Sequence, residues 1–153
     1  MLVPKRLLPI PHQRQRSDGD CLAACAAMVL AYLERGVDYG RLRQLLKIKS
    51  YGAPASNIRL LAQLDLVVTY GVTDMVSLEN MLAQGQPVIV FVRTGELPYW
   101  DYNSDHALVV VGYDENSLYV NDPYFPDVPF TVSQGDFELA WLERDYYYAL
   151  ITL

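Results

Sequence analysis

The sequence predicts an α+β fold in which an N-terminal helical half, containing a buried helix, packs on a C-terminal antiparallel sheet. Helix-forming runs dominate the chain before Asp65, and short runs rich in Val, Ile, Thr and Tyr dominate it afterwards. Helices followed by strands is the layout of an α+β fold with segregated halves. The length of 153 residues suits one domain with a full core, so we expect a single domain over residues 1–153.

The first half of the chain supplies an extended arm and then three helices. Three prolines exclude regular helix from residues 1–16. The S-D-G-D segment, residues 17–20, offers turn and N-cap chemistry, and a helix-forming run begins directly after it at Cys21. This run is apolar nearly all round, so we expect it in the middle of the domain. Further helices are expected after Asp38 and from near Ser56.

The second half of the chain reads as strands with two short helices between them. A polar, aromatic loop over residues 94–105 divides this half after its second strand. Strands are expected over residues 66–70, 87–92, 107–113, 117–122, 129–132 and 146–152, and helices over residues 77–84 and 137–142. The cleft between a helical half and such a sheet is a common place for chemistry.

Composition and charge exclude several classes of protein. Hydrophobic residues make up 52% of the chain, which is typical of a globular protein and not of a disordered one. The net charge of −6 argues against nucleic acid and anionic membranes as partners. No apolar run is long enough to span a membrane, and the proline-broken N-terminus does not resemble a signal peptide. Two cysteines in one short segment form no disulfide framework, so we expect reduced thiols and a cytoplasmic location.

Cys21 is the candidate nucleophile. A thiol reacts as the thiolate, and a helix N-terminus beside an imidazolium lowers the pKa of a cysteine. Asp20 is the expected N-cap, which makes Cys21 the first helical residue. Cys25 lies one turn further along the apolar run and is interpreted as a core residue. The helix alone leaves open that both cysteines are simply small core residues.

Gln15 is the candidate second donor of an oxyanion hole. It lies six residues before Cys21, and its side-chain N–H could join the backbone N–H of Cys21 in binding the oxyanion of acyl transfer. Gln13 is a second candidate, separated from Gln15 only by spacing. A glutamine on the surface with no such role is the alternative for both.

His106 and Asp122 lie at the ends of two consecutive predicted strands. His106 begins the most apolar strand, D-H-A-L-V-V-V-G-Y, with Asp105 beside it. Taken alone, His106 would be interpreted as a half-buried histidine that Asp105 satisfies. Asp122, however, lies at the exit of the next strand, because Pro123 ends that strand.

The register of this hairpin decides whether His106 and Asp122 can meet. A three-residue loop over residues 114–116 pairs Tyr113 with Ser117, and counting back pairs Asp122 with Leu108. Asp122 and His106 then become diagonal neighbours on one face of the sheet. A plain four-residue loop would shift the register by one and put them on opposite faces. A catalytic pair therefore requires the three-residue loop or a β-bulge.

With that geometry, the three residues predict nucleophilic catalysis. His106 would take the proton of Cys21, or hold it as an ion pair, and later protonate the leaving amine, while Asp122 orients the imidazole ring. A zinc site formed by Cys21, Cys25, His12 and His106 has poor ligand spacing. We therefore expect no metal and no cofactor, and interpret His12 as structural or incidental.

The residues around these positions resemble a known family. Q-R-S-D-G-D-C-L-A-A-C-A-A-M-V-L-A-Y resembles the opening of the bacteriocin-processing peptidase domains, papain-like enzymes that trim leader peptides after a double glycine. H-A-L-V-V-V-G-Y-D with L-Y-V-N-D-P, and L-E-N-M-L-A-Q-G-Q-P-V-I-V-F-V before them, are similar to later segments of that family. The resemblance covers nearly the whole chain. It implies a papain-like fold with Cys21 as nucleophile, Gln15 as oxyanion-hole donor, His106 as base and Asp122 as its orienter.

Two features depart from the common form of the family. Leu22 stands directly after the nucleophile, where the family commonly has Gly, and its bulk at the helix start predicts a narrower substrate groove. The chain also shows no Walker loop and no membrane span, so it resembles the free-standing members and not the transporter-fused ones.

The resulting hypothesis is a free-standing cysteine peptidase that hydrolyses peptide bonds in peptides or unfolded tails, such as leader peptides. A catalytically silent peptide-binding domain is one alternative, although such domains lose the Cys. A Cys-dependent acyl transferase or amidase on the same fold is another, because the chemistry of the triad is shared. The Tyr99-Trp100 pair in the loop is a candidate to line a substrate groove or an interface.

Overall fold

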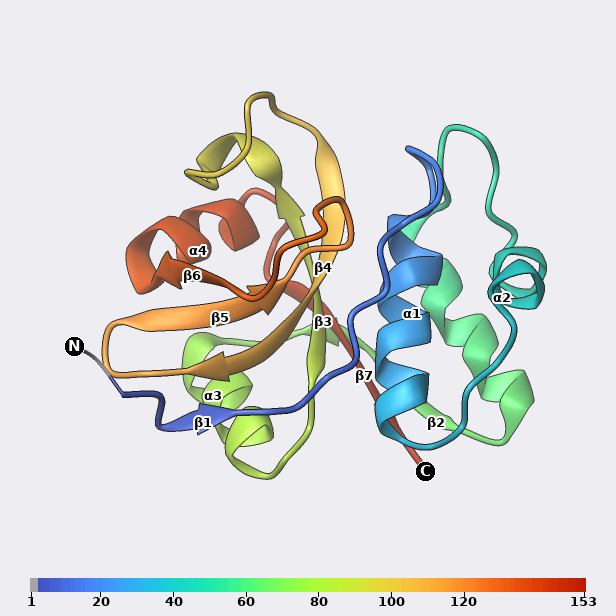
Figure 1. Ribbon diagram of the computed structural model, residues 1–153, viewed down its shortest axis with the longest axis horizontal. Coiled ribbons are helices and arrows are strands. Elements are labelled where there is room, and N and C mark those ends of the chain that lie inside the picture. The colour runs from blue at the N-terminus through green and yellow to red at the C-terminus, as the bar shows by residue number, and fades with distance from the viewer. Residues whose placement is uncertain (1–2) are drawn as a thin grey trace.

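The computed structural model describes residues 3–153 and has a seven-stranded antiparallel sheet at its centre, in the order β2-β7-β3-β4-β5-β6 with β1 paired to β4 (Figure 1). The strands are β1 (Arg6–Leu7), β2 (Val67–Val72), β3 (Val88–Arg93), β4 (Asp105–Tyr113), β5 (Ser117–Asn121), β6 (Phe130–Ser133) and β7 (Tyr147–Thr152). The helices are α1 (Cys21–Tyr32), α2 (Tyr39–Leu45), α3 (Met75–Ala83) and α4 (Gln134–Leu142), and η1 (Ala55–Leu64) and η2 (Thr94–Glu96) are 3-10 helices.

The helices lie on both faces of the sheet. Figure 1 shows α1 and α2 together on one side of the sheet, and α3 and α4 on the other side. This arrangement confirms the predicted α+β fold, with the first half of the chain packed on a sheet built by the second. The helices of the second half cover the face that α1 leaves open.

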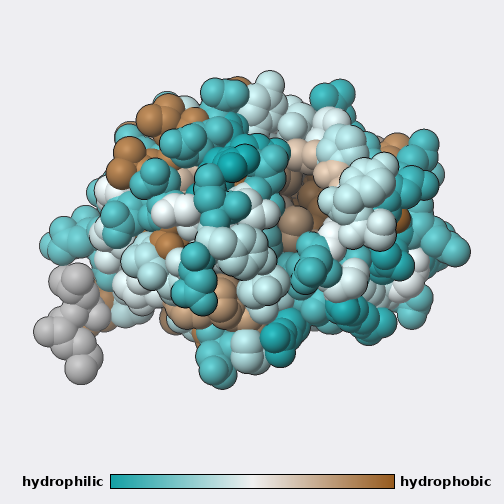
Figure 2. Space-filling model, turned by 90° about the horizontal axis from the view of Figure 1, so that it is seen from above, coloured by the Kyte–Doolittle hydropathy of each residue, from teal (hydrophilic) through white to brown (hydrophobic). Residues whose placement is uncertain are grey.

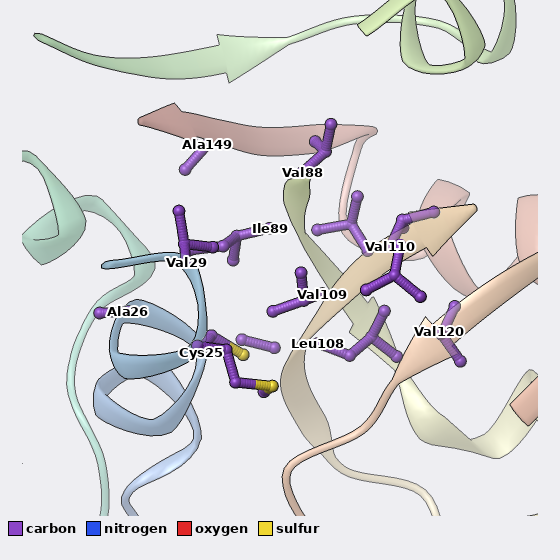
Figure 3. Packing of buried hydrophobic residues seen from close by; sticks show 14 of the residues in the cluster. Cys25, Ala26, Val29, Val88, Ile89, Leu108, Val109, Val110, Val120 and Ala149 are labelled. Atoms are coloured by element: carbon purple, nitrogen blue, oxygen red, sulfur yellow. The ribbon is translucent and has the colours of Figure 1, made fainter. Parts of the chain in front are cut away.

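Helix α1 is the central packing element, as its apolar sequence predicts. Its residues from Leu22 to Ala26 are buried, and so are Met28, Val29 and Leu30. In Figure 3, Val29 points toward Ile89 of the sheet, and Cys25 lies on the side of α1 that faces β4. Small side chains along α1 allow its backbone to approach the sheet closely, which sets the position of the residue at its start.

The third predicted helix is a 3-10 helix, η1, instead of an α-helix. Its apolar residues Ile58, Leu61 and Leu64 recur at every third position, which is the period of a 3-10 helix. Ile58 and Leu61 are fully buried on the face that this spacing creates. Leu60 and Ala62 are also apolar, so the sequence pattern alone does not distinguish a 3-10 helix from an α-helix.

The β4–β5 hairpin has a register different from the one predicted, with the same result. Tyr113 pairs with Leu118 and not with Ser117, so four residues connect the paired positions. Between Val110 and Gly112 the register then shifts by one, so that Val109 pairs with Asn121. Continuing that count places Asp122 opposite Leu108. Residues 114–116 do separate the two strands, but the predicted pairing of Tyr113 with Ser117 is wrong. The β-bulge, the other means that the sequence analysis allowed, lies at Val111 and restores the required register.

The N-terminal arm is tied to the bulge. Predicted only as an extended segment, it forms the short strand β1 and pairs with the end of β4. The N–H of Leu8 donates to the carbonyl oxygen of Val111, the residue at the bulge, over 2.7 Å. Gly112 lets the arm approach, because a Cβ atom there would collide with the carbonyl oxygen of Arg6.

Candidate active site

Cys21 is the first residue of α1, as predicted, but Asp20 does not cap the helix with its side chain. The buried carboxylate of Asp20 instead accepts a hydrogen bond from the Tyr39 hydroxyl at 3.0 Å and one from Arg43 Nε at 2.9 Å. Both partners come from α2, so the local capping motif gave the wrong partner. The ion pair holds the turn before Cys21 against α2.

The turn before Cys21 also lies directly against a second loop. A Cβ atom on Gly19 would stand within 2.7–2.8 Å of the backbone of Lys49, Ser50 and Gly52, where real Cβ atoms are essentially never found. Only glycine therefore allows the loop over residues 49–52 to cross here. This contact places the loop at the edge of the space in front of Cys21.

His106 lies at the start of β4 and is bonded to Asp122 just past the end of β5. His106 Nε2 and Asp122 Oδ1 are 2.7 Å apart, and both side chains are buried. The thiol of Cys21, which is only partly buried, lies beside the imidazole of His106, close enough for His106 to shift the pKa of the thiol. The structure thus brings together three of the four residues that the sequence analysis selected, Cys21, His106 and Asp122.

Asp122 accepts hydrogen bonds from three other groups besides His106. The Tyr99 hydroxyl and Trp100 Nε1 donate to its Oδ2 at 2.9 and 2.8 Å, and the backbone N–H of Tyr124 donates to its Oδ1 at 3.0 Å. The Trp100 ring also packs edge-on against the His106 ring, with centroids 4.9 Å apart. Both oxygens of the carboxylate are therefore held, and its orientation is fixed from several sides.

The pKa values of the three groups move in the directions that an ion pair requires. Burial by itself raises the pKa of the Cys21 thiol, but the hydrogen bond and charge of His106, with the backbone N–H of Ala107, bring it below its usual value. Burial lowers the pKa of His106, whereas Asp122 and then Cys21 raise it to about 10. Burial raises the pKa of Asp122, yet His106 and the donors around it bring it below the usual value. All three shifts favour the charged forms, which are a thiolate, an imidazolium and a carboxylate.

A cleft of about 290 Å³ opens in front of Cys21 and His106. Figure 2 looks onto this face and shows a hollow with an apolar floor and a polar rim. The cleft is lined by Asp18, Gly19, Cys21, Leu22, residues 51–55, Phe91, residues 104–107 and Arg144. Leu22, the residue that departs from the family pattern, is almost fully buried and contributes to this lining.

Gln15 lies beside the cleft and does not line it. Its Nε2 donates to the carbonyl oxygens of Ser17 at 2.9 Å and Asp18 at 3.3 Å, and its Oε1 is buried without a hydrogen-bond partner. Gln15 lines the adjoining hollow, which shares Asp18 with the cleft. The Nε2 of Gln13 is bonded to the carbonyl oxygen of Arg14. In this structure neither glutamine is aimed at Cys21.

The remaining cysteine and histidine stand apart from this chemistry. Cys25 is fully buried, and burial raises the pKa of its thiol well above the usual value, with Cys21 adding to the shift. His12 Nε2 is 2.7 Å from the carbonyl oxygen of Phe125. Within residues 3–153, no group of three or more His, Cys, Asp and Glu side chains is arranged to hold a metal ion.

The central antiparallel sheet, with a buried helix that begins at Cys21 and a cleft between them, defines a papain-like α+β domain. The chain belongs to the Peptidase_C39 like family, whose model matches residues 7–149. The predicted resemblance to bacteriocin-processing peptidase domains is thereby confirmed. No curated protein matches the chain with significance.

Solved structures of the same fold come from this family. A C39-like peptidase from Bacillus anthracis superposes with a TM-score of 0.80 at 18% identity, covering 97% of this chain and 98% of the other. The peptidase domain of Streptococcus ComA, a bi-functional ABC transporter, gives 0.74 at 22% identity, with 96% and 97% covered. A double glycine motif protease from a PCAT transporter, solved with its leader peptide, gives 0.73 at 20% identity, with 99% and 96% covered. No helix among residues 3–153 is long and apolar enough to cross a membrane.

Two groups at the site were not assigned by the sequence analysis. Tyr99 and Trp100 were expected to line a groove or an interface, but their polar ends are bonded to Asp122, and the cleft lining does not include them. Their loop position and hydrogen-bonding ends were the available signal. Arg144, which follows the last helix, reaches the cleft from a part of the sequence with no motif.

Replacing Asp122 by Asn tests the electrostatics of the pair. Loss of the carboxylate should lower the pKa of His106 by about 1–3 units, because an adjacent opposite charge favours the imidazolium by that amount. The pKa of Cys21 should rise, because the influence of His106 on the thiol exceeds the direct repulsion from Asp122. The pH profile of Cys21 alkylation by iodoacetamide should therefore move upward.

The chain has two histidines, so His106 can be assigned by NMR against a His12→Gln variant and titrated directly. An unchanged His106 titration and an unchanged alkylation profile in Asp122→Asn would contradict the arrangement described here.

Tyr99→Phe and Trp100→Phe each remove one donor from a buried carboxylate oxygen. We expect each to lower the free energy of unfolding by about 1.5–3 kcal/mol, the usual contribution of a hydrogen bond to a charged group. Tyr51→Phe is the matched control, since Tyr51 is 86% exposed. Equal stability of Tyr99→Phe and Tyr51→Phe in chemical denaturation would show that the bond to Asp122 contributes nothing.

Proposed function

We propose that the chain is a cysteine peptidase that hydrolyses peptide bonds, with Cys21 as nucleophile, His106 as acid and base, and Asp122 as the group that orients His106. The observation that carries the proposal is the position of His106, which is hydrogen-bonded to Asp122 and lies beside the thiol of Cys21 at the edge of a cleft. A histidine that was merely satisfied by its sequence neighbour Asp105 would have no reason to contact a thiol. Asp105 is instead paired with Arg93.

In the proposed reaction the Cys21 thiolate attacks the carbonyl carbon of the substrate peptide bond, forming a C–S bond and placing the negative charge on the carbonyl oxygen. His106, protonated in the resting pair, gives its proton to the leaving nitrogen as the C–N bond breaks. His106 then takes a proton from water, whose oxygen attacks the thioester and releases Cys21. Because Nε2 faces Asp122, the other ring nitrogen, Nδ1, is the one that exchanges protons.

The proposed substrates are peptides or unfolded protein tails. A related double glycine motif protease has been solved with a leader peptide, which supports a peptide as the occupant of the corresponding cleft here. Retention of Cys21, His106 and Asp122 favours an enzyme over a silent binding domain. We further propose that the enzyme acts as a free-standing peptidase and in the cytoplasm, where its two free cysteines stay reduced.

The proposal is tested by combining thiol labelling with cleavage of a peptide library. Native protein treated with iodoacetamide near pH 6 should be modified at Cys21 and not at the buried Cys25, because Cys21 alone has a lowered pKa. Cys21→Ala should lose all cleavage of library peptides, whereas Cys25→Ala should retain it. Slow labelling of Cys21 together with no cleavage by the wild type would refute the proposal that the chain is a peptidase. Cleavage that survives Cys21→Ala would assign the nucleophile to another residue.

Gln15 is proposed as the second oxyanion donor, beside the backbone N–H of Cys21. Its amide would have to leave the carbonyl oxygens of Ser17 and Asp18 and turn into the cleft when substrate binds. Gln15→Ala should then lower kcat by about 10²-fold or more with little change in KM, the usual effect of losing such a donor. Gln13→Ala is the matched control and should leave kcat unchanged. Equal kcat values for the two variants would exclude Gln15 from the reaction.

A further inference from the structure

The rim of the cleft carries one carboxylate shared by two guanidinium groups. Asp105, 61% exposed, is 2.9 Å from Arg93 Nη1 and 3.6 Å from Arg144 Nη1, through the same oxygen, Oδ1. The short contact with Arg93 is a hydrogen bond, whereas the longer one with Arg144 is not. Two positive charges and one negative charge leave this group of three residues with a net charge of +1.

Arg144 is the member of this group that reaches the cleft with donors to spare. A guanidinium has five N–H donors. The side chain of Arg144 makes no hydrogen bond within residues 3–153, and its one ion-pair contact there is the 3.6 Å approach to Asp105. Arg144 lines the cleft together with Cys21 and His106, while Arg93 is not part of the lining.

The backbone fixes Arg144 in this position. Its N–H donates to the carbonyl oxygen of Trp141 at 3.0 Å, and its own carbonyl oxygen accepts from the N–H of Tyr147 at 3.3 Å. Trp141 is fully buried, so the turn between α4 and β7 is anchored in the core. The side chain itself is 26% exposed, which is enough for contact with a ligand while most of it is held.

The charged side chains that line the cleft lie in two places, Asp18 at its border and Asp105 with Arg144 at its rim. Asp18 also lines the cleft, but it additionally lines the adjoining hollow with Arg14 and Arg16, so it lies at the border between the two. Arg144 and Asp105 line the cleft and do not line the adjoining hollow. Phe91 and Ala107 are buried lining residues that supply an apolar wall for the methylene groups of a long side chain.

We propose that Arg144 determines specificity, and that the cleft takes a peptide carrying a carboxylate, from an Asp or Glu side chain close to the bond that is cut. The proposal rests on the peptidase function proposed above. The carboxylate would accept two hydrogen bonds from the fork of Arg144, which Asp105 leaves unused. The apolar wall would cover the stem of the bound side chain.

Binding to Cys21→Ala measures this preference without turnover. Fluorescein-labelled peptides that are cleaved by the wild type, or failing these a fixed eight-residue peptide series, are prepared with Glu, Gln or Lys at each position in turn and an amidated C-terminus. By fluorescence anisotropy, one Glu peptide should bind about 5- to 10-fold more tightly than its Gln counterpart, the effect of a partly exposed ion pair with good geometry. A Gln peptide with a free C-terminus tests whether a terminal carboxylate is the true ligand, an outcome that would overturn the side-chain assignment.

Charge variants of Arg144 in the same background identify the residue responsible. Arg144→Gln should abolish the preference for Glu, and Arg144→Glu should favour the Lys peptide. Arg144→Lys should retain only part of the preference, because lysine keeps the charge but not the fork. Arg41→Gln, which removes an exposed arginine of α2, is the matched control and should bind as the parent does. A preference for Glu that survives both Arg144→Gln and Arg144→Glu would overturn the proposal, as would equal binding of Glu, Gln and Lys peptides by the parent.

Cleavage by the wild type separates this inference from the proposed function. If the protein binds the Glu peptide preferentially and cleaves nothing, the peptidase proposal fails and the assignment of Arg144 stands. If it cleaves Glu and Gln peptides with equal kcat/KM, the assignment of Arg144 fails and the peptidase proposal stands. The Tm of Arg144→Glu shows whether this variant keeps its fold. If the Tm is unchanged and the variant prefers the Lys peptide, the change in preference comes from a direct contact with residue 144.

Discussion

The buried carboxylate of Asp122 is the constraint on which the rest of the site depends. A carboxylate in a protein interior is strongly unfavourable unless charges and hydrogen bonds compensate for the water that it loses. Here the compensation comes from His106 on β4, from Tyr99 and Trp100 in the loop before β4, and from the backbone after β5. Because these segments must meet at one point, the hairpin register, the aromatic loop and the imidazole orientation are fixed together. The interaction of His106 with Cys21 and the resulting charge on His106, together with the backbone N–H of Ala107, lower the pKa of Cys21.

The hairpin shows how far local sequence can predict such a site. Sequence alone indicated that His106 and Asp122 had to share a face, and offered a three-residue loop or a bulge as the means. The loop is set locally, since Asp114 Oδ1 accepts from the N–H groups of Asn116 and Ser117. The bulge depends on the N-terminal arm, because the carbonyl oxygen of Val111 accepts from the N–H of Leu8, about a hundred residues away. The alternation of apolar and polar residues along a strand does not indicate contacts between residues so far apart in the sequence.

The same distinction between local and distant contacts explains where else the structure agrees with the sequence-based predictions and where it differs from them. The helix start at Cys21 was predictable, because turn residues followed by an apolar run define it locally. The partners of Asp20 were not, because Tyr39 and Arg43 come from the next helix. The side chain of Gln15 is held by the turn that follows it, so its spacing from Cys21 alone did not determine its direction. The sequence could therefore select the residues of the proposed triad, whereas the residues that hold them in place could not be predicted.

Charge balance connects the triad to the rim of the cleft. A thiolate, an imidazolium and a carboxylate carry a net charge of −1, within a chain whose net charge is −6. An acidic peptide side chain approaching such a site would be repelled unless positive charge stood nearer to it than the triad does. The group formed by Arg93, Asp105 and Arg144 has a net charge of +1, with Arg144 in the cleft lining and Arg93, paired with Asp105, outside the lining. Since Asp105 directly precedes His106 on β4, the strand that positions the proposed catalytic base also positions the carboxylate that both arginines approach. Selectivity for acidic peptides is thus compatible with a negatively charged triad and a negatively charged protein.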